Sequence, residues 1–271
     1  MDVKKTEEME VSAPTSFSPL GGEKVPKADE GPRSGDARPV NGCIDRNTYT
    51  KNNVPPLMPA RLRGFGPLGI LAIVVILAGA LVSPLVSAPL VLLWVYLSKT
   101  PWSEIGYVRT SVRKLLIATA GGIAFKLLMK ALVMPLLGAD PINRAYHFLA
   151  GNPAAIPGML FTIIVGAGFG EETFFRGWMF ERLGKLLGTS VAAKSAIVII
   201  SSSLFAAAHY SVQGVAGTEQ AAITGLVFGT IFMITGRLFP LMCAHVAFDL
   251  TAYALIYWNL ETKVAGLIFH R

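Results

Sequence analysis

The longest uncharged stretch of this chain limits its fold more than any other feature does. Residues 65–97 contain no Asp, Glu, Lys or Arg, and Pro84 and Pro89 interrupt the run in its interior. About 20 apolar residues suffice for a helix to cross a bilayer, so this run forms either one long kinked helix or two short ones. Basic residues precede it at Arg63 and follow it at Lys99. Because cytoplasmic flanks are rich in Lys and Arg, this placement favours a tight helical pair that turns near residues 83–89.

Apolar runs separated by short polar turns continue to the end of the chain. Over the whole sequence 52% of residues are hydrophobic and 15% are charged, against about 25% charged residues in an average soluble domain. Further runs of helical length lie at 113–137, 155–187, 191–210, 219–236 and 238–258. Together with the first pair they predict an all-α fold, a polytopic transmembrane helical bundle of about seven spans.

The N-terminal quarter of the chain has a different composition. Residues 1–63 hold ten Lys/Arg and nine Asp/Glu, together with Pro, Gly and Ser. Such a segment buries too little apolar surface to offset its ordering entropy, so we predict a disordered polar tail at 1–63 and a transmembrane domain at 64–271. The formal net charge of +7 therefore lies mainly on the membrane part. There it fits the charge rule for cytoplasmic loops better than nucleic-acid binding, and the predicted partner is the lipid bilayer.

A few ionisable side chains lie inside the predicted spans, where charge is costly and marks a functional site by default. They are Lys126, Lys130, Glu171, Glu172, Arg176, His209, His245 and Asp249. Glu172 and Arg176 are four residues apart and share a helical face, so a structural ion pair is as good an interpretation as a functional one. Glu171 is rotated by about 100° from Glu172 and has no such partner. This favours a carboxyl group that acts as a general base.

Two histidines lie in later spans. If the turn after 155–187 centres near Ser190, Glu171 lies nineteen residues before it and His209 nineteen after it. An antiparallel pair then brings both to a similar depth, although a packing or capping role for His209 is the plainer alternative. His245 and Asp249 are four apart, which suits a histidine oriented by a carboxylate, two ligands of one metal, or a polar helix contact. The two lysines in 113–137 are interpreted as snorkelling or lining residues.

These residues fall in three short motifs that resemble the CPBP family, the CAAX-protease and bacteriocin-processing (Abi) intramembrane proteases. Residues 171–176 (EETFFR) resemble its EExxxR element, 205–209 (FAAAH) its FxxxH element, and 245–249 (HVAFD) its HxxxN/D element. Residues 101–106 (PWSEIG) are similar to a weaker Trp-containing segment, so the resemblance covers about 98–258. Each motif alone is weak, whereas three in the family's order, each within an apolar span, are specific.

The resemblance implies an endopeptidase whose site lies inside the helical bundle and whose substrate is a membrane-associated protein or peptide. Carried over by position, Glu171 is the general base that activates water, assisted by His209. His245 and Asp249 then stabilise the oxyanion or help to hold a metal. The residues expected to support the site are Glu172, Arg176 and Phe205.

Position 249 bears on whether the implied site contains a metal. The prenyl-protease branch of the family has Asn here, whereas this chain has Asp249. An amide can donate a hydrogen bond to an oxyanion but an ionised carboxylate repels one, so Asp249 must be protonated, orient His245 or bind a metal. The candidate ligands of a Zn²⁺ ion are Glu171, His209, His245 and Asp249. The balance leans slightly toward metal, and a glutamate-dependent mechanism without metal is the alternative.

The predicted spans are also compatible with other types of protease and with functions other than proteolysis. The chain has no HExxH, GxSG or GxGD motif, which disfavours the other types of intramembrane protease. A bacteriocin-immunity or scaffold protein, or a proton-coupled transporter that uses Glu171 and His209 as a relay, would keep the same spans. Within the protease interpretation the substrate is a prenylated CaaX protein, a leader peptide or a membrane-anchored regulator. Asp249 favours the prokaryotic-type branch and so a plasma membrane; a eukaryotic CaaX-processing enzyme would lie in the endoplasmic reticulum.

Overall fold

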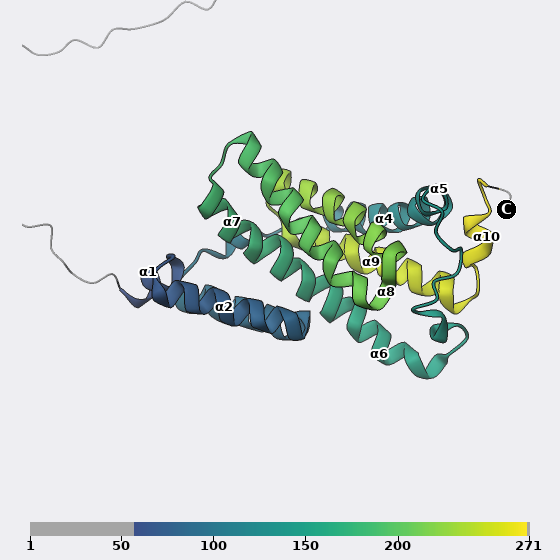
Figure 1. The fold of residues 1–271 in the computed structure, drawn as a ribbon, viewed down its shortest axis with the longest axis horizontal. Coiled ribbons are helices and arrows are strands. Elements are labelled where there is room, and N and C mark those ends of the chain that lie inside the picture. The colour runs from purple at the N-terminus through teal and green to yellow at the C-terminus, as the bar shows by residue number, and fades with distance from the viewer. Residues whose placement is uncertain (1–56, 270–271) are drawn as a thin grey trace, which may run out of the picture. The chain divides into compact units, whose positions relative to one another are not determined.

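The computed structural model describes residues 57–269, which form helices joined by short turns (Figure 1). The α-helices are α1 (Met58–Arg63), α2 (Pro67–Val82), α3 (Pro84–Ser98), α4 (Val112–Leu128), α5 (Met134–Leu136), α6 (Ile156–Phe161), α7 (Met179–Leu187), α8 (Val191–Thr235), α9 (Leu238–Tyr257) and α10 (Glu261–Ala265). The other helical segments are the π-helices η2 (Met129–Val133) and η5 (Thr162–Trp178) and the 3-10 turns η1 (Trp102–Ile105), η3 (His147–Leu149) and η4 (Pro153–Ala155). Within this part of the chain there is no strand, and the predicted all-α fold is confirmed.

The surface of the helices is suited to a membrane. Four helical segments of the described chain are long and apolar enough to cross one, namely Val112–Leu136, Pro153–Leu187, Val191–Thr235 and Leu238–Tyr257. Helices α2 and α3 are apolar but shorter, with 16 and 15 residues. Large apolar side chains point outward along these helices, as the 91% exposure of Leu81 and the 78% exposure of Ile234 illustrate. Because water would penalise so much exposed apolar surface, lipid is the medium that covers it.

The uncharged run forms the predicted helical pair. Helix α2 ends at Val82, and the side chain of Ser83 caps α3 by accepting a hydrogen bond from the Leu85 backbone N–H at 3.1 Å. Pro84 opens α3, where its missing N–H has no helical partner to lose. The two helices fold back on each other, since a Cβ atom added to Gly79 of α2 would lie within 4 Å of side chains of α3.

Helix α8 is also a hairpin. Gly214 has φ 64° and ψ −161°, which breaks the helix and turns the chain. The arms pair about this residue: Ser202 packs against Gly225, and Val198 against Gly229. An added Cβ at Gly225 would lie 3.0 Å from Ser202 Cβ, so small side chains set the close approach of the arms. The two spans predicted here are therefore confirmed as two helices, with longer arms and a tighter turn than predicted.

Helix α1 lies inside the segment that composition assigned to the tail. The predicted boundary was Gly64, whereas residues 58–63 are helical and packed on the bundle. Trp94 donates a hydrogen bond from Nε1 to the Leu62 carbonyl at 3.1 Å, and Arg182 donates to the Arg63 carbonyl at 2.8 Å. A six-residue helix is unstable alone, so these tertiary contacts explain what composition could not predict. The rest of the predicted tail, residues 1–56, lies outside the described residues.

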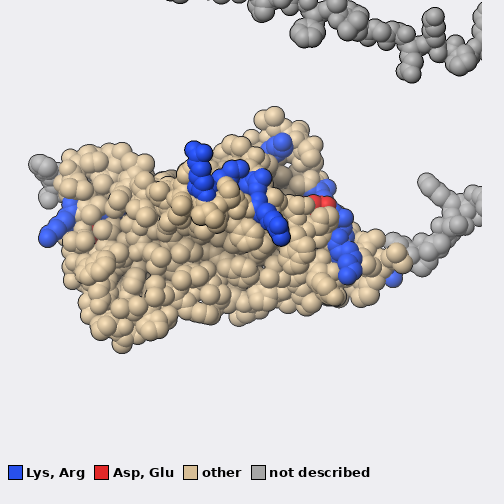
Figure 2. All heavy atoms as spheres, turned by 180° about the vertical axis from the view of Figure 1, so that it is seen from behind, with Lys and Arg blue, Asp and Glu red and all other residues tan. Residues whose placement is uncertain are grey.

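Basic residues gather at the end of the bundle that carries α1 (Figure 2). The residues at the helix termini of this end are Arg61, Arg63, Lys99, Arg109, Arg113, Lys114, Arg182, Lys185, Lys194 and Arg237. The Leu238 N–H donates to the Gly106 carbonyl at 2.9 Å, which joins the start of α9 to the segment before α4. By the charge rule for cytoplasmic loops, this basic end is the predicted cytoplasmic side.

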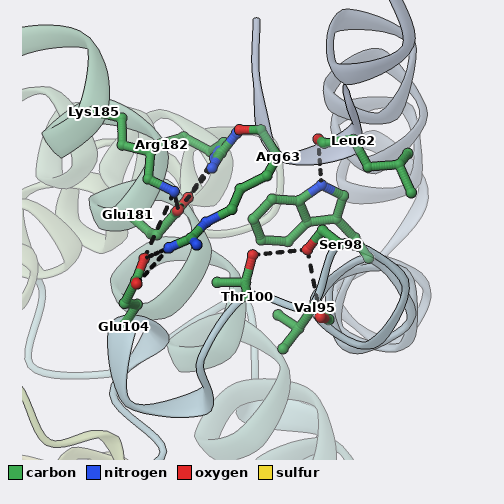
Figure 3. Close-up of polar contacts among 10 residues, drawn as sticks. Leu62, Arg63, Val95, Ser98, Thr100, Glu104, Glu181, Arg182 and Lys185 are labelled. Carbon is green, nitrogen blue, oxygen red and sulfur yellow. Dashed lines mark hydrogen bonds and ion pairs between the residues drawn. The ribbon is translucent and has the colours of Figure 1, made fainter. Parts of the chain in front are cut away.

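A polar cluster fastens α1, η1 and α7 together at the basic end (Figure 3). Glu104 of η1 pairs with Arg63 of α1 and lies 3.6 Å from Lys185 of α7. Glu181 pairs with its neighbour Arg182 and with Lys185. The hydrogen bond from the Arg63 guanidinium holds the pKa of the Glu104 carboxyl below its ordinary value of 4.5. The cluster therefore joins segments that are far apart in the sequence.

Candidate active site

Three helical segments bring the predicted site residues to one place inside the bundle. The contributors are η5 with Glu171, Glu172 and Arg176, α8 with Phe205 and His209, and α9 with His245 and Asp249. The sequence predicted one regular helix at 155–187, but Thr162–Trp178 is π-helical, a rare form that is frequent at functional sites. Its glycines admit close neighbours: an added Cβ at Gly170 would lie 3.1 Å from Pro84.

The innermost contact joins Glu172 to an arginine and a histidine. Arg176 donates from Nη1 to Glu172 Oε1 at 2.9 Å, so the i,i+4 ion pair considered from sequence is present. His245 Nδ1 lies 2.7 Å from the same oxygen. Glu172 and Arg176 are 0% and 1% exposed, and the Arg176 guanidinium lies 4.4 Å from the Phe205 ring centroid. This network is fully desolvated, and it fixes the ring of His245.

The other nitrogen of His245 faces two carboxylates. Nε2 lies 3.8 Å from Glu171 Oε2 and 3.7 Å from Asp249 Oδ2. Both distances exceed hydrogen-bond length, and Glu171 Oε2 is buried without a hydrogen-bond partner among residues 57–269. The i,i+4 contact expected between His245 and Asp249 is thus present. Glu171 has a free acceptor atom beside an imidazole that Glu172 holds from its other side.

His209 lies near this group without touching a carboxylate. Its Nδ1 is 2.8 Å from the Phe205 carbonyl oxygen of its own helix, and its ring centroid is 4.6 Å from that of Phe205. No ion pair links it to a carboxylate of the described chain. The turn at 188–190 places it opposite Glu171, as hairpin geometry predicted, and the two meet across a cavity instead of in direct contact.

A cavity of about 230 Å³ connects the candidate residues. Glu171, His209, His245 and Asp249 all line it, and Phe205 forms part of its wall. Glu172 and Arg176 lie behind this lining. The cavity is large enough for several waters or a short peptide segment, and its carboxylates and imidazoles converge on that space.

The resemblance makes Glu171, His209, His245 and Asp249 the candidate ligands of a Zn²⁺ ion. Among residues 57–269, no three His, Cys, Asp or Glu side chains come close enough together to hold a metal ion. His209 stays apart from the carboxylates, and Glu172 rather than an ion occupies His245 Nδ1. The nearest set is His245 Nε2 with Glu171 Oε2 and Asp249 Oδ2, at 3.8 and 3.7 Å, and the dependence on a metal stays a prediction.

The two lysines of the segment Val112–Leu136 have different surroundings. Lys130 pairs with Glu261 at 3.0 Å, so it has the partner that the sequence did not reveal. Lys126 is 6% exposed and donates from Nζ to Gln220 Oε1 at 2.8 Å. Lys126 and Gln220 both line the cavity, so the predicted lining role holds for Lys126. Sequence gave no signal for Gln220, because a glutamine in an apolar span is not ionisable.

Comparison with known proteins bears on the same segment. Residues 153–251 match the family model for type II CAAX prenyl endopeptidases, described as Rce1-like. The match spans η4 to α9, contains all three motifs, and confirms the resemblance to the CPBP family over this part of the chain. The Trp-containing segment at 101–106 lies outside it. No curated protein and no solved structure matched the chain.

The match and the fold together define a class of protein. The described helices are those of an integral membrane protein, and residues 153–251 are similar to endopeptidases of the CAAX-protease type. The predicted plasma-membrane location stays a prediction.

Proposed function

We propose that this chain is an intramembrane endopeptidase that cleaves a membrane-associated substrate ending in a prenylated CaaX sequence. The observation that carries the proposal is the free acceptor atom of Glu171, which borders a cavity shared with His245 and Asp249. The prenylated CaaX substrate is inferred from the matched family, the type II CAAX prenyl endopeptidases.

Glu171 is the general base. A water in the cavity donates a proton to Glu171 and attacks the scissile carbonyl carbon, which forms a tetrahedral intermediate. The proton taken up by Glu171 then passes to the leaving amine as the C–N bond breaks. Glu171 is suited to this exchange because Oε2 has no competing hydrogen bond within the described chain.

His245 stabilises the oxyanion. Glu172 accepts from Nδ1–H, so His245 donates from Nε2 to the oxyanion as the imidazolium, in which both ring nitrogens are protonated, and the nearby carboxylates of Glu171 and Asp249 favour that charged form. Asp249 was expected to be protonated, to orient His245 or to bind a metal. Its position 3.7 Å from Nε2 supports the second role, orientation of the His245 ring. Glu172 and Arg176 act through His245 and are positioning residues. His209 lies across the cavity and assists Glu171 in holding the water.

The proposal is tested with purified protein in lipid nanodiscs and a farnesylated peptide that ends in a CaaX sequence. Mass spectrometry should find one cut on the carboxyl side of the prenylated cysteine. The Glu171→Gln variant, purified in parallel, should not cut and so excludes a contaminating protease. A wild-type protein that folds but cleaves neither this peptide nor a leader-peptide substrate would contradict the proposal and favour a scaffold or immunity protein. Proton-coupled flux across vesicles would instead indicate a transporter.

A further inference from the structure

A buried lysine that forms no ion pair within residues 57–269 lies beside the proposed active site. Lys126 is 6% exposed, and its ammonium group forms one hydrogen bond, to Gln220 Oε1 at 2.8 Å. No carboxylate of residues 57–269 pairs with it, and the Phe248 ring lies 4.8 Å from Nζ. An ammonium buried in a membrane protein is costly unless it is neutralised, so its presence calls for a partner.

Lys130, in the same helical segment, has a carboxylate partner that neutralises its charge. One turn after Lys126, it bonds the Pro141 carbonyl and pairs with Glu261 at 3.0 Å. Glu261 also accepts from the Asn143 N–H at 3.0 Å, so α10 and the loop after α5 are tied to this cation. The fold thus supplies an acidic partner for Lys130 and none for Lys126.

Lys126 lies where two cavities meet. It lines the active-site cavity of about 230 Å³ and a second cavity of about 370 Å³, which includes Lys130 and Arg144 in its lining. Asn143, Gln213 and Gln220 also line both cavities. The space next to the ammonium group is therefore polar, rich in amides, and continuous with the space that Glu171 borders.

The active-site cavity is lined by one lysine and by two carboxylates that form no ion pair with it. Glu171 and Asp249 lie on the active-site side, and they repel an anion placed next to them. Lys126 is the cation of the active-site cavity, and amide side chains surround it. An extended substrate that places its reacting carbonyl at Glu171 can bring the negative charge of its own C-terminus to Lys126, which forms no ion pair in the described chain.

We propose that Lys126 and Gln220 form a subsite for the free C-terminal carboxylate of the peptide substrate. The Lys126 ammonium supplies a charge-assisted hydrogen bond, and the Gln220 amide nitrogen, which donates no hydrogen bond to the rest of the described chain, supplies a second donor. The subsite rests on the proposed function, because it is the position of Glu171 that makes the carboxylate part of a substrate. It makes the enzyme selective for peptide bonds close to a chain terminus.

The test compares two farnesylated CaaX peptides of identical sequence, one with a free carboxylate and one with a C-terminal amide. Binding to the Glu171→Gln variant is measured first, because binding does not require cleavage. The acid should bind about 10- to 100-fold more tightly than the amide. Adding Lys126→Met to this variant should reduce acid binding to the level of the amide, and adding Lys126→Arg should keep part of the preference.

Two controls separate a subsite from a structural role. Lys114→Met removes an exposed lysine from the same helix and should leave the preference unchanged. Lys126→Met should leave the melting temperature equal or higher, because it removes a buried charge that forms no ion pair within the described chain. Equal binding of acid and amide, binding of neither, or a preference that survives Lys126→Met would overturn the assignment. Discrimination without any cleavage by the wild-type protein would instead contradict the proteolytic function and leave the subsite standing.

Discussion

The imidazole of His245 is bound to Glu172 rather than to the glutamate next to it. Nδ1 of His245 lies 2.7 Å from Glu172 Oε1, an oxygen that already accepts a hydrogen bond from Arg176. Of the two adjacent glutamates, Glu172 is therefore held by Arg176 and His245, whereas Glu171 keeps an acceptor atom that has no partner among residues 57–269.

Replacing Arg176 with methionine should strongly destabilise the protein. Glu172 is 0% exposed and would lose its permanent cation, and breaking a buried ion pair typically costs about 3–5 kcal/mol. Thermal unfolding in detergent measures the effect. Arg144→Met breaks the exposed i,i+4 pair with Asp140 and should leave the unfolding temperature nearly unchanged. Equal losses in the two variants would show that burial of the pair does not matter.

Packing between α4 and α9 depends on one of two adjacent glycines. A Cβ atom added to Gly122 would overlap the Ala244 carbonyl, whereas one added to Gly121 would meet nothing within 4 Å. Gly122→Ala should therefore force the helices apart and cost about 1–3 kcal/mol. It should also lower proteolysis, because α9 carries His245 and Asp249.

Gly121→Ala is the matched control for this contact. Alanine is favoured over glycine inside a helix by about 1 kcal/mol, so this variant should be as stable as the wild type or more stable. If unfolding experiments found the two alanine variants alike, the close approach of α4 and α9 would be contradicted.

The polar cluster at the basic end should make stability depend on pH. Arg63 lowers the pKa of Glu104 below its ordinary value of 4.5, so the ionised carboxylate stabilises the fold. This contribution is fully present above pH 4.5, the ordinary value, and is lost as pH falls below it through the folded-state pKa. The difference in melting temperature between wild type and Glu104→Gln should thus be constant near neutral pH and shrink in acid. A difference that grew on acidification would have the wrong sign.

Removal of metal should not abolish activity. The proposed base Glu171 needs no metal to accept a proton from water, and Glu172 occupies Nδ1 of His245. The rate of peptide cleavage should therefore be the same before and after dialysis against EDTA, and elemental analysis should find less than one zinc per chain. Chelation that stops cleavage, followed by recovery on adding Zn²⁺, would show that the ligands rearrange around an ion and would restore the metal expectation.

The sequence predicted the parts of this structure that depend on local pattern. The length of the apolar runs gave the helices, and the position of Ser190 placed Glu171 opposite His209 across one cavity. It did not predict α1, because Met58–Arg63 is held by tertiary contacts to Trp94 and Arg182. Composition is insensitive to such contacts.

Within the site, spacing identified pairs on one helix but not the pairs between helices. The contacts Glu172–Arg176 and His245–Asp249 follow from a separation of four residues. The contact between His245 and Glu172 joins residues 73 positions apart, and no periodicity indicates it. The missing counter-ion of Lys126 likewise depends on which groups α8 and α9 bring toward it.

The central claim is that Glu171 supplies the base for peptide hydrolysis, and one comparison tests it directly. Glu171→Gln keeps the size of the side chain and removes the proton acceptor, while Glu219→Gln makes the same change on α8 outside both cavities. Both variants should fold and bind the farnesylated peptide. The cleavage rate should fall by about 100-fold or more in Glu171→Gln and stay unchanged in Glu219→Gln. Cleavage by Glu171→Gln at a rate near that of the wild type would contradict the claim.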